Sequence, residues 1–154
     1  MITLKVGDKA PDFELGDQNG NKVRLSSFKG KKVILYFYPK DDTPGCTKEA
    51  CDFRDNIKKL QTNGVVVLGV SNDNLESHKK FSSKYNLNFP ILSDVDKKVS
   101  KKYGVYEEKE KFGHKYMGIT RSTFVIDENG RIEKVYYKVN PEEHINEILT
   151  EICE

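Results

Sequence analysis

The chain has 154 residues, with 26 basic and 24 acidic side chains and a net charge of +2. Hydrophobic residues make up 36% and charged residues 32% of it, a composition typical of a globular protein with a substantial core. The near-balanced charge argues against a nucleic-acid partner, because the lysines are scattered singly or in pairs and form no basic patch.

No apolar run approaches the length of a membrane-spanning helix, and the N-terminal region lacks the apolar core of a signal peptide. We therefore expect a cytoplasmic protein with no membrane partner. Because neither a linker nor an internal repeat interrupts the sequence, residues 1–154 are predicted to form a single domain. The three cysteines of such a chain favour reactive thiols over a disulfide framework.

The first part of the chain is predicted to alternate strands and helices. An Asn19-Gly20 pair supplies the turn of a hairpin, and Gly64 ends a helix whose apolar residues recur at helical spacing. The predicted elements are a hairpin over 13–25, a connector at 26–30, a strand at 33–38, a helix from 44 to 64, a strand at 65–70, a helix at 75–85 and a short strand at 89–92.

The second part begins with a predicted helix at 96–103. Residues 104–120 have no clear hydrophobic period and are predicted to form a long loop. A second hairpin is predicted over 122–138, and a last helix is predicted to open at Asn140, with Pro141 at its first position. These elements describe a mixed α/β protein, with a central sheet and helices on both faces.

The most informative segment places a cysteine at the start of the helix that follows the strand at 33–38. Thr43 is predicted to be the N-cap, and Pro44 fits the first helical position, where its missing N–H costs nothing. Cys46 then lies among backbone N–H groups that have no partner within the helix. These donors and the positive end of the helix dipole favour a thiolate, so the segment predicts a reactive cysteine.

Other polar residues carry weaker signals. Glu49 is either a solvated helix residue or an active-site contact. Cys46 and Cys51 lack zinc-ligand spacing, so neither a metal site nor a bound cofactor is predicted. The histidines are predicted to be surface residues without a catalytic role: His78, His114 and His144.

The segment resembles the active-site signature of the peroxiredoxins, which is Pro, three residues, Thr or Ser, two residues and Cys. Here Pro39, Thr43 and Cys46 fill it. The continuation from Gly45 to Asp55 is similar to the branch of the bacterioferritin comigratory protein, also called peroxiredoxin Q. Residues 7–13, 103–105 and 118–127 match as well, although Tyr106 stands where many members have Trp.

This resemblance implies a thioredoxin-like fold with an N-terminal β-hairpin extension. It also implies a peroxidase in which Cys46 attacks hydrogen peroxide or an organic hydroperoxide and becomes a sulfenic acid. In the family, the residue matching Arg121 stabilises the thiolate and aligns the peroxide, a task suited to a planar cation. Thr43 would donate its hydroxyl to the thiolate or the peroxide, and Pro39 would limit access of solvent to the sulfur.

The resemblance further implies that Cys51 is the resolving cysteine. Cys153 is a second candidate for that role. Five helical residues separate the Cα atoms of Cys46 and Cys51 by about 8–9 Å, whereas a disulfide needs less than about 7 Å. The first turns of the helix must therefore unwind before this pair can close. Thioredoxin or a similar dithiol protein is the implied reductant, and a monomer is the implied state.

Two other functions fit a cysteine pair of this kind. A thiol–disulfide oxidoreductase of the thioredoxin type would need Cys-x-x-Cys and a proline before the strand that faces it. Here the second cysteine comes three residues late, and Ile119-Thr120-Arg121 precede the strand. A redox-sensing binding module would switch a partner surface without turnover, so catalytic consumption of peroxide distinguishes it from a peroxidase.

Overall fold

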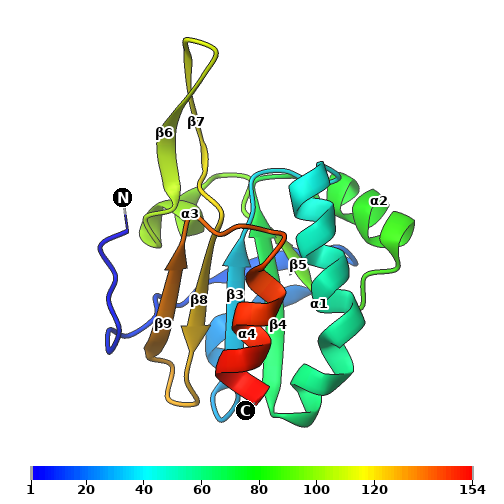
Figure 1. Ribbon diagram of the computed structural model, residues 1–154, viewed down its shortest axis with the longest axis vertical. Coiled ribbons are helices and arrows are strands. Elements are labelled where there is room, and N and C mark those ends of the chain that lie inside the picture. The colour runs from blue at the N-terminus through cyan, green and yellow to red at the C-terminus, as the bar shows by residue number, and fades with distance from the viewer. Residues whose placement is uncertain (1, 154) are drawn as a thin grey trace.

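The computed structural model describes residues 2–153, with side chains as far as Ile152. A twisted sheet forms the centre, and helices lie against it (Figure 1). The elements are β1 (Glu14–Asp17), β2 (Lys22–Arg24), the 3-10 helix η1 (Leu25–Phe28), β3 (Lys32–Phe37), α1 (Pro44–Thr62), β4 (Val65–Ser71), α2 (Leu75–Tyr85), β5 (Ile91–Ser93), α3 (Lys98–Lys102), β6 (Tyr106–Lys111), β7 (His114–Ile119), β8 (Ser122–Ile126), β9 (Ile132–Tyr137) and α4 (His144–Cys153).

The main sheet has seven strands in the order β2-β1-β5-β4-β3-β8-β9. Strand β3 is parallel to β4 and antiparallel to β8, with Phe37 opposite both Val70 and Ser122. Because β3 runs into α1 while β8 begins beside the end of β3, the start of α1 and the start of β8 lie at the same edge of the sheet. This topology brings Cys46 close to Arg121, although 75 residues separate them along the chain.

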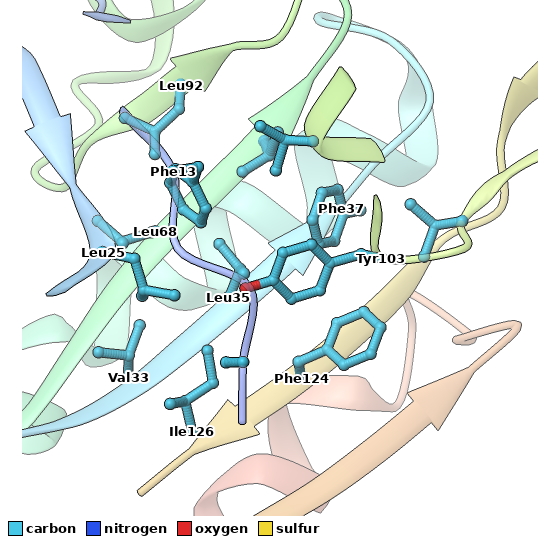
Figure 2. Packing of buried hydrophobic residues seen from close by; sticks show 14 of the residues in the cluster. Phe13, Leu25, Val33, Leu35, Phe37, Leu68, Leu92, Tyr103, Phe124 and Ile126 are labelled. Atoms are coloured by element: carbon cyan, nitrogen blue, oxygen red, sulfur yellow. The ribbon is translucent and has the colours of Figure 1, made fainter. Parts of the chain in front are cut away.

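The two faces of β3 enter two different apolar clusters, as the alternation of side chains along a strand requires. Val33, Leu35 and Phe37 pack with Phe13 and Tyr103 under the N-terminal segment, η1 and α3 (Figure 2). The opposite face is covered by α1, α2 and α4, and its cluster contains Ile34, Tyr36, Tyr38, Phe53, Phe81 and Ile148. Burial on both faces explains the continuous apolar runs of β3 and β4.

The predicted loop over 104–120 is wrong, because the structure has a second, two-stranded sheet there. Strands β6 and β7 form an antiparallel hairpin that projects from the body of the protein (Figure 1). Its turn consists of Phe112 and Gly113, both at positive φ (52° and 79°), as a two-residue hairpin turn requires. The hairpin covers no core along most of its length, so its sequence lacks the alternation that would have indicated strands.

Three smaller predictions also need correction. Helix α4 begins at His144, because residues 141–143 form a turn closed by the Asn140 side chain, which accepts from the Glu142 N–H at 3.0 Å. His78 and His144 are buried, with 0% and 1% of their surface exposed, whereas His114 is exposed as predicted. Both buried rings are hydrogen-bonded through their two nitrogens, which makes burial of an imidazole tolerable.

Among the described residues, no helix is long and apolar enough to cross a membrane.

Candidate active site

The site begins where the chain passes from β3 into α1. Thr43 occupies the N-cap position in extended conformation, as predicted, although its side chain makes no capping bond. The Thr43 hydroxyl instead donates to the Lys40 carbonyl at 2.9 Å and closes the preceding loop. The N–H groups of Gly45 and Cys46, at the second and third helical positions, therefore have no acceptor within the helix or from this cap.

Arg121 is the residue that meets the cysteine. Its Nη2 donates to the Cys46 Sγ at 3.2 Å, and its Nη1 donates to the Glu49 Oε1 at 2.7 Å. The three side chains are largely removed from solvent, because Cys46 is 1% exposed, Glu49 is 2% exposed and the Arg121 side chain is 13% exposed. One guanidinium thus holds a thiol and a carboxylate that lie one helical turn apart on α1.

Gly45 makes this approach possible. A Cβ atom on Gly45 would lie 3.0 Å from the Arg121 Nη2 and 3.2 Å from the Pro141 Cγ. Any larger residue would therefore push the guanidinium away from the sulfur or displace the segment that precedes α4. The glycine is needed here for close packing.

Burial raises the pKa of Glu49 to about 7, against the opposing effect of the Arg121 charge. Its second oxygen, Oε2, has no hydrogen-bond partner among the described residues. Burial by itself would lower the pKa of Arg121, but the neighbouring Glu49 and Cys46 raise it, so the guanidinium stays charged. The site therefore contains a permanent cation beside a thiol and a buried carboxyl group.

Cys51 lies on the same helix, five residues beyond Cys46, and is half-buried. Both cysteines are free thiols, and α1 is unbroken from Pro44 to Thr62. Burial raises the pKa of Cys51, and the nearby Arg54 acts in the opposite direction. In this state Cys51 is a protonated thiol that an intact helix keeps away from Cys46.

The remaining predicted residues are less informative. Pro39 is exposed, and its role as a cover for the sulfur stays a prediction. The side chain of Cys153, the second candidate for the resolving thiol, lies outside the described residues.

The sequence did not indicate a buried polar cluster under the loop that leads to α1. Asp41, Asp73 and His78 bring ligand-type atoms within 4.8 Å of one another, a group that could hold a metal ion. These side chains already bond to each other and to the backbone, so we interpret the cluster as a hydrogen-bonded support. No motif marks it, because its members come from the loop, from the segment between β4 and α2, and from α2 itself.

Known proteins agree with this arrangement. The model of the AhpC/TSA family matches residues 6–135. A putative peroxiredoxin Bcp of Coxiella burnetii is 53% identical over 148 residues, which cover 96% of this chain and 98% of that protein. Peroxiredoxin Bcp of Bacillus subtilis is 49% identical over 148 residues, with coverage of 96% and 94%.

Solved structures match over nearly the whole chain. A mutant of Xylella fastidiosa PrxQ superposes with a TM-score of 0.94 at 31% identity, covering 99% of this chain and 98% of that one. The bacterioferritin comigratory protein of Xanthomonas campestris, whose structures concern its alkyl peroxide reduction activity, gives 0.89 at 33% identity, covering 99% and 98%.

The fold is thus the thioredoxin-like fold of these proteins, and together with the relatives it defines a thiol-dependent peroxidase. The chain belongs to the AhpC/TSA family, and within it to the group of peroxiredoxin Q and the bacterioferritin comigratory protein.

Proposed function

We propose that Cys46 is the peroxidatic cysteine and that Arg121 is its activating partner. The observation that carries this proposal is the 3.2 Å contact between the Arg121 Nη2 and the Cys46 Sγ at the start of α1. A guanidinium beside the sulfur stabilises a thiolate, and its planar set of N–H groups suits hydrogen bonds to a peroxide oxygen.

In the first step the Cys46 thiolate attacks the terminal oxygen of hydrogen peroxide or of an organic hydroperoxide. The O–O bond breaks, and the departing hydroxide or alkoxide takes a proton and leaves as water or alcohol. The Arg121 guanidinium and the N–H groups of Gly45 and Cys46 stabilise the negative charge on the departing oxygen. We propose that Thr43 orients the peroxide through its hydroxyl and that Pro39 limits access of water.

In the second step Cys51 attacks the Cys46 sulfenic acid, forming an intramolecular disulfide and releasing water. This step requires the first turns of α1 to unwind, because the two cysteines now lie in one intact helix. A dithiol protein such as thioredoxin then reduces the disulfide by exchange. We further propose that residues 1–154 act as one domain, that the protein works as a monomer, and that it acts in the cytoplasm.

The test is peroxide consumption by the reduced chain with thioredoxin, thioredoxin reductase and NADPH. Cys46→Ser is expected to abolish turnover, because the serine hydroxyl stays protonated. The matched control is Cys51→Ser, which keeps the nucleophile and is expected to consume one equivalent of peroxide and then stop. Sustained turnover by Cys46→Ser would refute the proposal.

A further inference from the structure

The loop that leads to α1 is tied to helix α2 by its two carboxylates. Asp42 bonds to Lys84 and to the Tyr85 hydroxyl at 2.8 and 2.9 Å, but Asp42 and Lys84 are exposed, so the contacts contribute little. Asp41 is buried, with only 4% of its side chain exposed. Asp41 is therefore the residue that can hold the loop firmly.

Three side chains converge on the Asp41 carboxyl group. The Tyr38 hydroxyl donates to Oδ1 at 2.6 Å, while the Ser77 hydroxyl donates to Oδ2 at 2.8 Å. The His78 Nδ1 lies 2.6 Å from Oδ2, and its ring has no exposed surface. The Asp41 backbone N–H in turn donates to the Asp73 Oδ2 at 2.9 Å, which joins the loop to the segment between β4 and α2.

Both nitrogens of the His78 ring are hydrogen-bonded. Its Nε2 lies 2.9 Å from the Leu92 carbonyl oxygen, which can only accept, so Nε2 carries a proton. Its Nδ1 lies against the Asp41 carboxyl group, to which the Tyr38 and Ser77 hydroxyls also donate. The ring therefore ties Asp41 to the backbone of β5.

We propose that the triad of Tyr38, Asp41 and His78 is a positioning device for the catalytic loop. The triad holds residues 39–43 in the conformation that presents the Cys46 sulfur to Arg121. The inference rests on the proposed function of Cys46. It assigns a role to side chains that do not touch the reacting atoms, and it makes β3, β5 and α2 parts of the catalytic framework.

A pair of tyrosines allows a matched test. Tyr38 and Tyr103 are both buried, and each hydroxyl donates at 2.6 Å, Tyr38 to Asp41 and Tyr103 to the Pro11 carbonyl on the other face of the sheet. Tyr38→Phe is expected to lower the second-order rate constant of Cys46 oxidation by hydrogen peroxide about fivefold, and His78→Gln about twentyfold. Tyr103→Phe is expected to leave that rate constant within about twofold, although it loses a comparable hydrogen bond.

One further measurement separates positioning from a general loss of stability. The Asp41 amide is expected to exchange faster in Tyr38→Phe than in Tyr103→Phe. Folded Tyr38→Phe protein with the wild-type rate of oxidation would overturn the positioning role.

These experiments distinguish failure of the triad's positioning role from failure of the proposed peroxidase function. Absence of peroxide consumption by the wild-type protein would overturn both proposals. Normal consumption through Cys46, with equal oxidation rates in Tyr38→Phe and Tyr103→Phe, would overturn only the role of the triad. If His78→Gln does not fold, the two tyrosine variants decide the question by themselves.

Discussion

The two halves of helix α1 are held in the protein by different forces. The first half is fixed by polar contacts, because Arg121 reaches across from the start of β8 to Cys46 and Glu49. The second half is fixed by apolar packing, through Phe53, Ile57 and Leu60 in the cluster between α1 and the sheet. For example, the Phe53 ring stacks on the Tyr36 ring, with the two centroids 4.8 Å apart.

The difference matters because only the first half must move during the proposed reaction. Polar contacts depend on charge, so they change when Cys46 changes its chemical state, whereas apolar packing does not. Once Cys46 enters a disulfide, Arg121 loses one of its two partners on α1, and its hold on the first turns weakens. The second half can then stay packed and serve as the base from which the helix refolds.

The most severe test of this contrast is Phe53→Ala. Removal of a buried aromatic ring is expected to lower the free energy of unfolding by about 3–5 kcal/mol, as judged from urea denaturation. Lys58→Ala, at an exposed position of the same helix, is the control and should change stability by less than about 0.5 kcal/mol. Equal effects of the two substitutions would contradict the assignment of the second half as the packed base.

In the first half, Arg121→Ala is expected to slow oxidation of Cys46 about a hundredfold, because one preorganised donor beside the reacting sulfur is lost. Arg121→Lys should restore part of the rate, since it returns the charge but not the planar fork. Arg131→Ala, which removes an exposed arginine in the turn between β8 and β9, serves as the control. An unchanged oxidation rate in Arg121→Ala would make this arginine merely structural.

Glu49 makes the first half sensitive to pH. Its pKa is raised to about 7 by burial, above the value of the unfolded chain, so the folded protein binds this proton more tightly than the unfolded chain does. The resulting stabilisation is complete below about pH 4.5 and is lost as the pH rises through 7. Relative to Glu49→Gln, the wild-type protein should lose roughly 2 kcal/mol of stability between pH 5 and pH 7.5. If the free energies of unfolding of the two proteins change with pH in the same way, the pKa of Glu49 is not raised in the folded protein.

Oxidation itself should separate the two halves. After one equivalent of peroxide, peptide mapping is expected to find a Cys46–Cys51 disulfide. Amide exchange should rise about tenfold or more across residues 44–52 while residues 53–62 stay protected. The same measurement on Cys51→Ser, which cannot form this bond, is the control, and Cys153→Ser should cycle normally. A Cys46–Cys153 bond, or uniform exchange along α1, would contradict the resolving role of Cys51.

The sequence was sufficient for elements with strong local signals. The apolar runs of β3 and β4, the hairpin turns and the boundaries of α2 all follow from periodicity and turn residues. The hairpin of β6 and β7 could not be predicted in this way. Its strands have solvent on both faces along most of their length, so selection for burial leaves no alternating pattern in Glu108, Lys109 and Glu110.

The same distinction holds at the site. The sequence alone determined that Cys46 begins a helix, because Pro44 and the preceding strand are local signals, and a motif resemblance marked Arg121. Only the tertiary structure decided that Arg121 pairs with Glu49 as well as Cys46, and that His78 is buried against Asp41. Those contacts join residues distant along the chain, and a charged or histidine side chain has the same sequence signature whether it faces water or a buried partner.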